Sequence, residues 1–165
     1  GLLKEAGNRK DKQTLNTIWA NIPRKLKQHF YLIEVYVTER LKFDDTADCE
    51  LLLKSALKGH WDHLLVRLYG LVVASDLVKQ QATAESWLNN HSRDAVLLLT
   101  LGRICMRNQL WGKARDYLGE SIDVQANPEA YYEFARLHEQ EGNREAAAEC
   151  YEKGLTLATG MSAVS

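Results

Sequence analysis

Apolar residues recur every three or four positions through most of the chain, which is the spacing of one face of an α-helix. Short polar stretches separate these periodic segments, and several of them carry an Asp, Ser or Thr that can cap the following helix. The pattern predicts a short N-terminal helix followed by four pairs of helices, so we expect an all-α fold. The predicted helices span residues 14–22, 30–41, 46–58, 62–74, 76–88, 94–107, 112–124, 129–140 and 144–157.

The predicted helices divide the chain into three parts. Residues 1–29 form a polar segment, in which we expect 4–13 to be solvated, followed by the N-terminal helix and a basic corner. Residues 30–158 form one helical domain, and residues 159–165 form a frayed tail. Only two prolines occur in 165 residues, which favours long helices over a turn-rich β-sandwich.

Charge and cysteine content exclude several classes of protein. The 21 basic and 22 acidic side chains give a net charge of −1, so no overall electrostatic attraction to nucleic acid exists. Cys49, Cys105 and Cys150 are widely spaced and form no C-x-x-C motif, which excludes a zinc ribbon and a thioredoxin-like site. Each lies in a helical apolar pattern, so we interpret them as free, buried thiols of a reducing compartment.

The pairs of helices repeat at an offset of 33 residues. Gly102 corresponds to Ala135 in the next pair, and Ala114 corresponds to Ala147. Small residues let the two helices of a hairpin approach closely, so we expect the closest crossing of one hairpin at Gly102. This pattern resembles the tetratricopeptide repeat, whose units are about 34 residues long. The resemblance implies a tetratricopeptide-like solenoid of about four antiparallel helix hairpins, wound as a right-handed superhelix.

A second resemblance is more specific. Residues 19–25 (WANIPRK) resemble the W-x-x-(L/I)-P-(R/K)-K corner of the HemY family, the protoheme IX biogenesis proteins. Residues 58–65, 97–114 and 145–147 resemble the linker and the later repeats of that family, so that the similarity covers roughly 14–157. The resemblance implies a pair of membrane helices upstream, which would anchor this domain at the bacterial inner membrane beside late haem-synthesis enzymes. The chain does not begin with Met, and we interpret it as a piece of such a protein.

The sequence contains no motif that indicates an enzyme. It holds no phosphate-binding glycine loop, no zinc-protease motif and no nucleophile elbow. His60 and His63 are three residues apart, and this spacing raises the alternative of a metal or haem-iron ligand pair. We expect His60 in a linker and His63 in the first turn of a helix, so a solvated pair is the favoured interpretation. We therefore predict no catalytic residue, no metal site and no required cofactor.

Arginines recur on the first helices of successive pairs. Arg103 and Arg107 are four residues apart and share one helix face, and Arg136 lies one repeat after Arg103. Guanidinium groups on a shared concave wall suit the carboxylates of an acidic or C-terminal peptide, or the propionates of a porphyrin. The alternative is that they pair with Glu and Asp of the same chain. The predicted partner-binding groove comprises Arg67, Leu99, Arg103, Arg107, Tyr132 and Arg136.

Together these features predict a non-enzymatic protein-interaction scaffold. By resemblance to the HemY family, its partners would be haem-synthesis enzymes, and nucleic acid is not expected among them. The domain would lie on the cytoplasmic side of the inner membrane, held there by segments outside this sequence. The alternative function is a carrier that binds haem or porphyrin directly.

Overall fold

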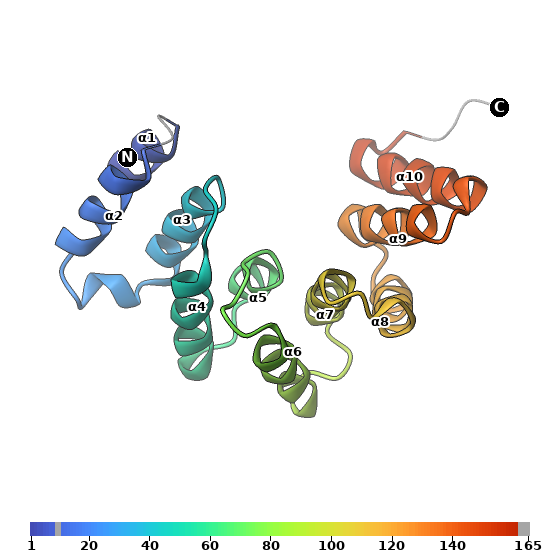
Figure 1. Ribbon diagram of the computed structural model, residues 1–165, viewed down its shortest axis with the longest axis horizontal. Coiled ribbons are helices and arrows are strands. Elements are labelled where there is room, and N and C mark those ends of the chain that lie inside the picture. The colour runs from blue at the N-terminus through green and yellow to red at the C-terminus, as the bar shows by residue number, and fades with distance from the viewer. Residues whose placement is uncertain (9–10, 162–165) are drawn as a thin grey trace. The chain divides into compact units, whose positions relative to one another are not determined.

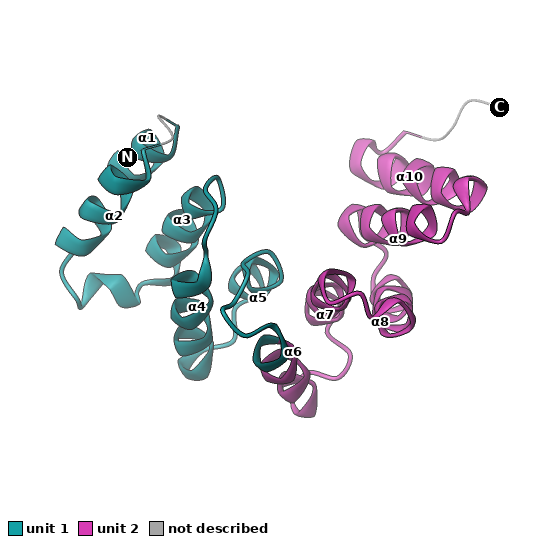
Figure 2. Cartoon of the chain, in the orientation of Figure 1, with its two compact units in different colours: residues 1–80 teal, residues 81–165 magenta. Residues whose placement is uncertain are grey.

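The computed structural model describes residues 1–8 and 11–161, and they form helices and connecting loops without a strand. The fold is an all-α set of antiparallel helix hairpins, as predicted (Figure 1). Two compact units divide the chain, residues 1–80 and residues 81–165 (Figure 2). The helices are α1 (Leu2–Asn8), α2 (Lys12–Asn21), η1 (Leu26–Gln28), α3 (Phe30–Arg40), α4 (Ala47–Gly59), α5 (His63–Tyr69), α6 (Leu77–Ser86), η2 (Trp87–Asn89), α7 (Ala95–Arg107), α8 (Trp111–Val124), α9 (Pro128–Gln140) and α10 (Arg144–Thr159).

The N-terminal segment of the first unit is more ordered than its polar composition suggests. We expected residues 4–13 to be solvated, but α1 packs against α3 and buries Leu3 and Ala6. At Gly7 a β-carbon would lie 2.6 Å from Cδ of Glu39, so glycine lets α1 approach α3 closely. The helix predicted over 14–22 is present as α2. Residues 9 and 10, which belong to the segment expected to be solvated, lie outside the described residues.

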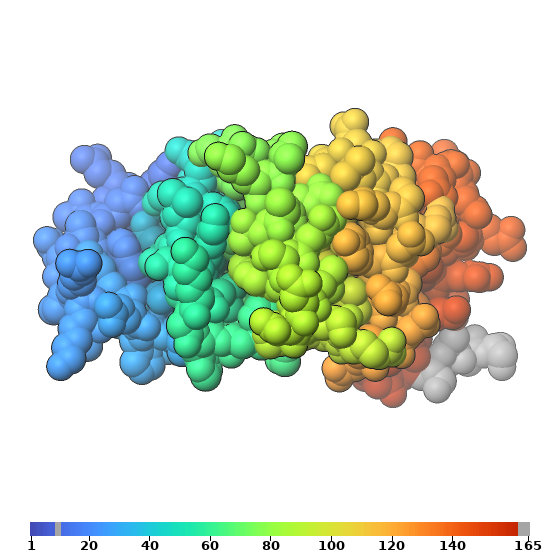
Figure 3. Space-filling view, turned by 90° about the horizontal axis from the view of Figure 1, so that it is seen from below, coloured from blue at the N-terminus to red at the C-terminus, as the bar shows by residue number. Residues whose placement is uncertain are grey.

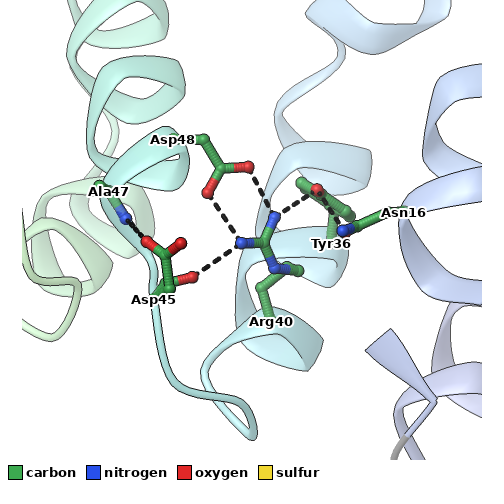
Figure 4. A network of polar contacts seen from close by, with 6 residues as sticks. All are labelled: Asn16, Tyr36, Arg40, Asp45, Ala47 and Asp48. Carbon is green, nitrogen blue, oxygen red and sulfur yellow. Dashed lines mark hydrogen bonds and ion pairs between the residues drawn. The ribbon is translucent and has the colours of Figure 1, made fainter. Parts of the chain in front are cut away.

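A buried arginine joins α3 to α4 in the first unit (Figure 4). The two terminal nitrogens of Arg40 donate to both carboxylate oxygens of Asp48, each at 2.7 Å. They also donate to the Tyr36 hydroxyl at 2.7 Å and to the main-chain oxygen of Asp45 at 2.8 Å. The Tyr36 hydroxyl in turn donates to Asn16 of α2 at 3.2 Å. Because Arg40 is only 2% exposed, these contacts compensate the cost of removing a charge from water.

Helix α5 is shorter than predicted. The apolar run favoured a helix over 62–74, but α5 ends at Tyr69 and a loop follows. The side-chain amide of Gln80 donates to the carbonyl oxygens of Tyr69 and Val72, at 3.0 and 2.9 Å. The amide of Val73 donates to the Thr46 hydroxyl at 2.8 Å. Side chains from distant positions therefore satisfy main-chain groups that a longer helix would otherwise satisfy, and a local pattern cannot reveal them.

The second unit consists mainly of two hairpins, α7–α8 and α9–α10, whose residues appear as successive bands from yellow to red in Figure 3. Each first helix begins at a side-chain cap. Asp94 accepts hydrogen bonds from the amides of Val96 and Leu97, and Asn127 accepts one from Ala130 ahead of Pro128 at the first helical position. The ends of these four helices agree with the prediction to within two residues. Residues 162–165 of the predicted tail lie outside the described residues.

The predicted crossing point of α7 and α8 is confirmed. A β-carbon at Gly102 would lie 2.6 Å from Cγ of Leu118, so no larger residue fits there without a shift of α8. Leu118 also reaches the next hairpin, because it forms a buried cluster with Leu99 of α7 and Ala130 of α9. One leucine therefore connects the two helices of its own hairpin and the first helix of the next.

The three cysteines are free thiols in the structure. Cys49 and Cys105 are buried, whereas Cys150 is half-buried and so departs from the expectation that all three are buried. Burial raises the pKa of Cys49 to about 12 and that of Cys105 to about 11. Among the described helices, none combines the length and the apolar content required to span a bilayer.

Candidate functional site

The predicted groove residues fall on three helices. Arg67 lies on α5 in the first unit and is half-buried, and its membership in a binding site stays a prediction. The other five lie in the second unit, on α7 and α9, which pack against each other. Their surroundings differ, so we describe them separately.

Arg103 is buried and paired within the chain. It is 8% exposed, and its Nε atom lies 3.2 Å from a carboxylate oxygen of Glu133 on α9. Its Nη2 atom lies 3.6 Å from Glu129, one helical turn earlier on α9. Its Nη1 atom is buried and has no hydrogen-bond partner among the described residues. Arg103 therefore joins α7 to α9. For this arginine the alternative given above holds, namely that it pairs with acids of the same chain.

Arg136 shares the same carboxylate but is open to solvent. Its Nη1 atom lies 3.3 Å from the second oxygen of Glu133, and its side chain is 52% exposed. The guanidinium also lies 5.9 Å from the centre of the Tyr132 ring, within range of a cation–π interaction. Two arginines on one carboxylate leave an excess of positive charge. We expect Arg136 to be the arginine that an external carboxylate reaches most easily.

Arg107 lies one turn after Arg103 on α7 and is half-buried. Burial lowers its pKa, and the nearby Glu133 carboxylate opposes that effect. We use the name arginine cluster for Arg103, Arg107 and Arg136 with the acids Glu129 and Glu133. Three positive and two negative groups give this cluster a formal charge of +1. It can accommodate one further carboxylate without excess negative charge.

The two apolar residues of the predicted groove differ in accessibility. Leu99 is 4% exposed and belongs to the buried cluster between the hairpins, so the prediction that it forms an accessible groove floor is wrong. Its side chain packs under α9, which the sequence pattern of α7 alone does not reveal. Tyr132 is 50% exposed, and its ring centre lies 6.0 Å from that of Tyr151 on α10.

The histidine pair lies where the sequence indicated. His60 follows α4 in a linker and stacks on Phe30, with ring centres 4.9 Å apart. His63 is the first residue of α5, which Asp62 caps. The described residues contain no group of three or more His, Cys, Asp or Glu side chains with the geometry of a metal site.

Sequence reasoning missed two of the charged residues that organise the structure. Glu133 bridges Arg103 and Arg136, and the spacing of Glu129, Glu133 and Arg136 along one helix face was the available signal. Arg40 makes four hydrogen bonds, to Tyr36 of its own helix, to Asp45 in the following loop and twice to Asp48 of α4.

Comparison with known proteins identifies the type of repeat. Residues 128–159 match the family model described as tetratricopeptide repeat. These residues are the α9–α10 hairpin, and α7–α8 repeats its small-residue positions 33 residues earlier. The fold is therefore a tetratricopeptide-like set of helix hairpins. Searches of curated proteins and of solved structures gave no match. Tetratricopeptide repeats typically bind other proteins, and this type of domain is therefore best understood as an interaction scaffold.

Proposed function

We propose that this domain is a non-enzymatic scaffold that binds a protein partner at the arginine cluster on α7 and α9. The observation that carries the proposal is the tetratricopeptide-type repeat, because hairpins of this type present their first helices as a binding wall. The charge of the cluster supports an anionic segment of the partner as the ligand. Arg136 supplies an exposed guanidinium for such a segment.

We further propose that the partner belongs to late haem biosynthesis and that the domain is held on the cytoplasmic side of the bacterial inner membrane. The resemblance of residues 19–25 to the HemY corner supports this proposal. In the structure Trp19 of that corner stacks on Tyr36, with ring centres 4.2 Å apart. The Lys27 ammonium lies over the same Trp19 ring, 5.8 Å from its centre. Arg24 and Lys25 remain exposed beside it.

Affinity capture from a bacterial membrane extract tests the scaffold role. We expect the wild-type chain to retain a discrete partner and the Arg107→Gln/Arg136→Gln variant to retain at least tenfold less. Each charge-assisted contact contributes about 1.5–3 kcal/mol, so even one lost contact accounts for that factor. Arg93→Gln/Arg144→Gln is the matched control, since both arginines are exposed and lie outside the cluster. Equal retention by the two double variants would exclude the cluster as the binding site.

A haem titration separates the scaffold from the alternative, a haem or porphyrin carrier. If the domain is a scaffold, haem added to the isolated chain should keep the absorption spectrum of free haem. A saturable Soret shift that Arg107→Gln/Arg136→Gln abolishes would instead show that the cluster holds propionates. The two results are exclusive, because a carrier must bind the pigment itself.

A further inference from the structure

In the second unit, helix α9 covers one surface of the α7–α8 hairpin, and this interface shows which residues a covering helix supplies. Helix α9 lies on α7–α8, where Ala130 packs against Leu99 and Leu118. Phe134 and Ile122 pack against the same cluster, and a β-carbon on Gly119 would lie 3.9 Å from the Phe134 ring. Glu133 of the covering helix pairs with Arg103 beneath it. A covering helix therefore supplies a small residue, an acid three positions later and a large residue next to that acid.

The α9–α10 hairpin repeats this surface 33 residues later. The equivalents of Leu99, Leu118 and Ile122 are Tyr132, Tyr151 and Leu155, which we name the end face. Leu99 is 4% exposed, whereas its equivalent Tyr132 is 50% exposed. Leu118 is buried and its equivalent Tyr151 is half-buried, while Ile122 is half-buried and its equivalent Leu155 is 65% exposed. The end face is thus apolar and aromatic like the covered surface, but it is open among the described residues.

Charge on the end face indicates which helix fits. Arg136 is the equivalent of Arg103. It can pair with a carboxylate of the covering helix, as Arg103 pairs with Glu133 of α9. Glu152 is the equivalent of Gly119 and is exposed. A large residue next to the acid would meet this carboxylate, so a basic residue suits that position better than phenylalanine.

We propose that the end face binds an amphipathic helix of a partner protein, seated as α9 is seated on α7–α8. The contact face of that helix carries a small residue over the two tyrosines, an acid for Arg136 and a basic residue for Glu152. This site differs from the arginine cluster in Tyr151 and Leu155, and it shares Arg136 with it. The proposal does not require the anionic segment proposed for the cluster.

The two N-terminal helices of a second copy fit the end face poorly. The N-terminal helix α2 contains no acidic residue, so it offers nothing to Arg136. Helix α1 has one acid, Glu5, but it is seven residues long and uses Leu3 and Ala6 against its own α3. A helix of different sequence, with the small–acid–base pattern, is the better match.

A helix-stabilised, fluorescein-labelled peptide of residues 127–141 with Phe134→Lys is the probe, because it carries the pattern in the geometry of α9. We expect saturable binding to the wild-type chain by fluorescence anisotropy. Leu155→Ser should weaken binding at least fivefold. Leu51→Ser is the matched control, since Leu51 is 63% exposed on α4 against 65% for Leu155. Arg107→Gln should leave peptide binding unchanged, which separates this test from that of the arginine cluster.

A double-mutant cycle tests the predicted ion pair between Arg136 of the chain and Glu133 of the peptide. A peptide that also carries Glu133→Gln should bind the wild-type chain at least threefold more weakly, and this difference should vanish on the Arg136→Gln chain. Absence of binding, or equal binding to Leu155→Ser, would overturn the proposal. Sedimentation gives a second way to overturn the proposal. If the wild-type chain forms a dimer and Leu155→Ser dissociates it, a second copy occupies the end face.

Discussion

Gly102 of α7 lies directly against Leu118 of α8. A β-carbon at position 102 would be 2.6 Å from Cγ of Leu118 and 3.6 Å from its main-chain nitrogen. The contact fixes how closely the two helices of this hairpin approach. Since Leu118 also packs on Ala130 of the next hairpin, a shift at this point is transmitted to α9.

Gly102→Leu should destabilise the chain by about 1–3 kcal/mol, because the added side chain forces Leu118 and α8 apart. The loss should appear as a lower midpoint in thermal unfolding followed by circular dichroism. Gly112→Ala on α8 is the control, since nothing lies within 4 Å of a β-carbon there. That control should keep or slightly raise the midpoint. An unchanged midpoint for Gly102→Leu would contradict the register of the hairpins.

Glu133→Gln should lower the free energy of unfolding by about 1.5–3 kcal/mol, since it leaves the buried Arg103 without its nearest carboxylate. For the same reason, Arg103→Ala should be destabilising, and its effect on binding cannot be measured free of its effect on folding. Urea unfolding gives the comparison, with the exposed Glu145→Gln on α10 as control. Equal midpoints for both variants would show that the pair contributes nothing to stability.

Asp48→Asn should have an effect that depends on pH. The Arg40 guanidinium holds the pKa of the Asp48 carboxyl below its usual range. Such a group stabilises the fold above its unfolded pKa, near 3.9, and that stability is lost as pH falls through the folded value. Because Asp48 is 61% exposed, solvent screening limits the effect to about 1 kcal/mol.

The difference in unfolding free energy between wild type and Asp48→Asn should therefore stay constant from pH 7 to 5 and shrink below about pH 4. Urea titrations at pH 7, 5 and 3 measure it. Asp44→Asn serves as a control in the adjacent loop, because Asp44 takes no part in the Arg40 contacts. A difference that grows toward acid would contradict the assigned ion pair.

The thiols should differ in reactivity. At pH 8 a pKa of about 12 leaves Cys49 almost entirely protonated, and Cys105 is protected in the same way. Iodoacetamide should therefore modify the half-buried Cys150 first in the native chain. Denaturation without reductant should then expose three alkylation sites by mass spectrometry. Fewer than three adducts would reveal a disulfide and contradict the predicted free thiols.

The repeat architecture was predictable because it depends on local periodicity. Helix spacing, the caps at Asp94 and Asn127 and the small residue Gly102 all act within one hairpin, so the sequence carries them directly. The end of α5 was not predictable, because Gln80 and Thr46 stabilise the following loop through contacts from elsewhere in the chain.

The candidate site was predictable only in part. Spacing placed Arg103, Arg107 and Arg136 on neighbouring first helices, and the structure brings them together through Glu133. Spacing along one helix does not tell which side chains the next helix buries. Leu99 was therefore assigned to an open groove although α9 covers it, and its equivalent Tyr132 is exposed.

The affinity of the captured partner for the wild-type chain and for Arg107→Gln/Arg136→Gln, at low and physiological salt, tests the scaffold role most directly. We expect wild-type binding that weakens as salt rises, since exposed charges are screened. The variant should bind at least tenfold more weakly while its melting temperature stays within a few degrees of wild type. Equal dissociation constants for a folded variant would contradict the account, because the arginine cluster would then take no part in binding.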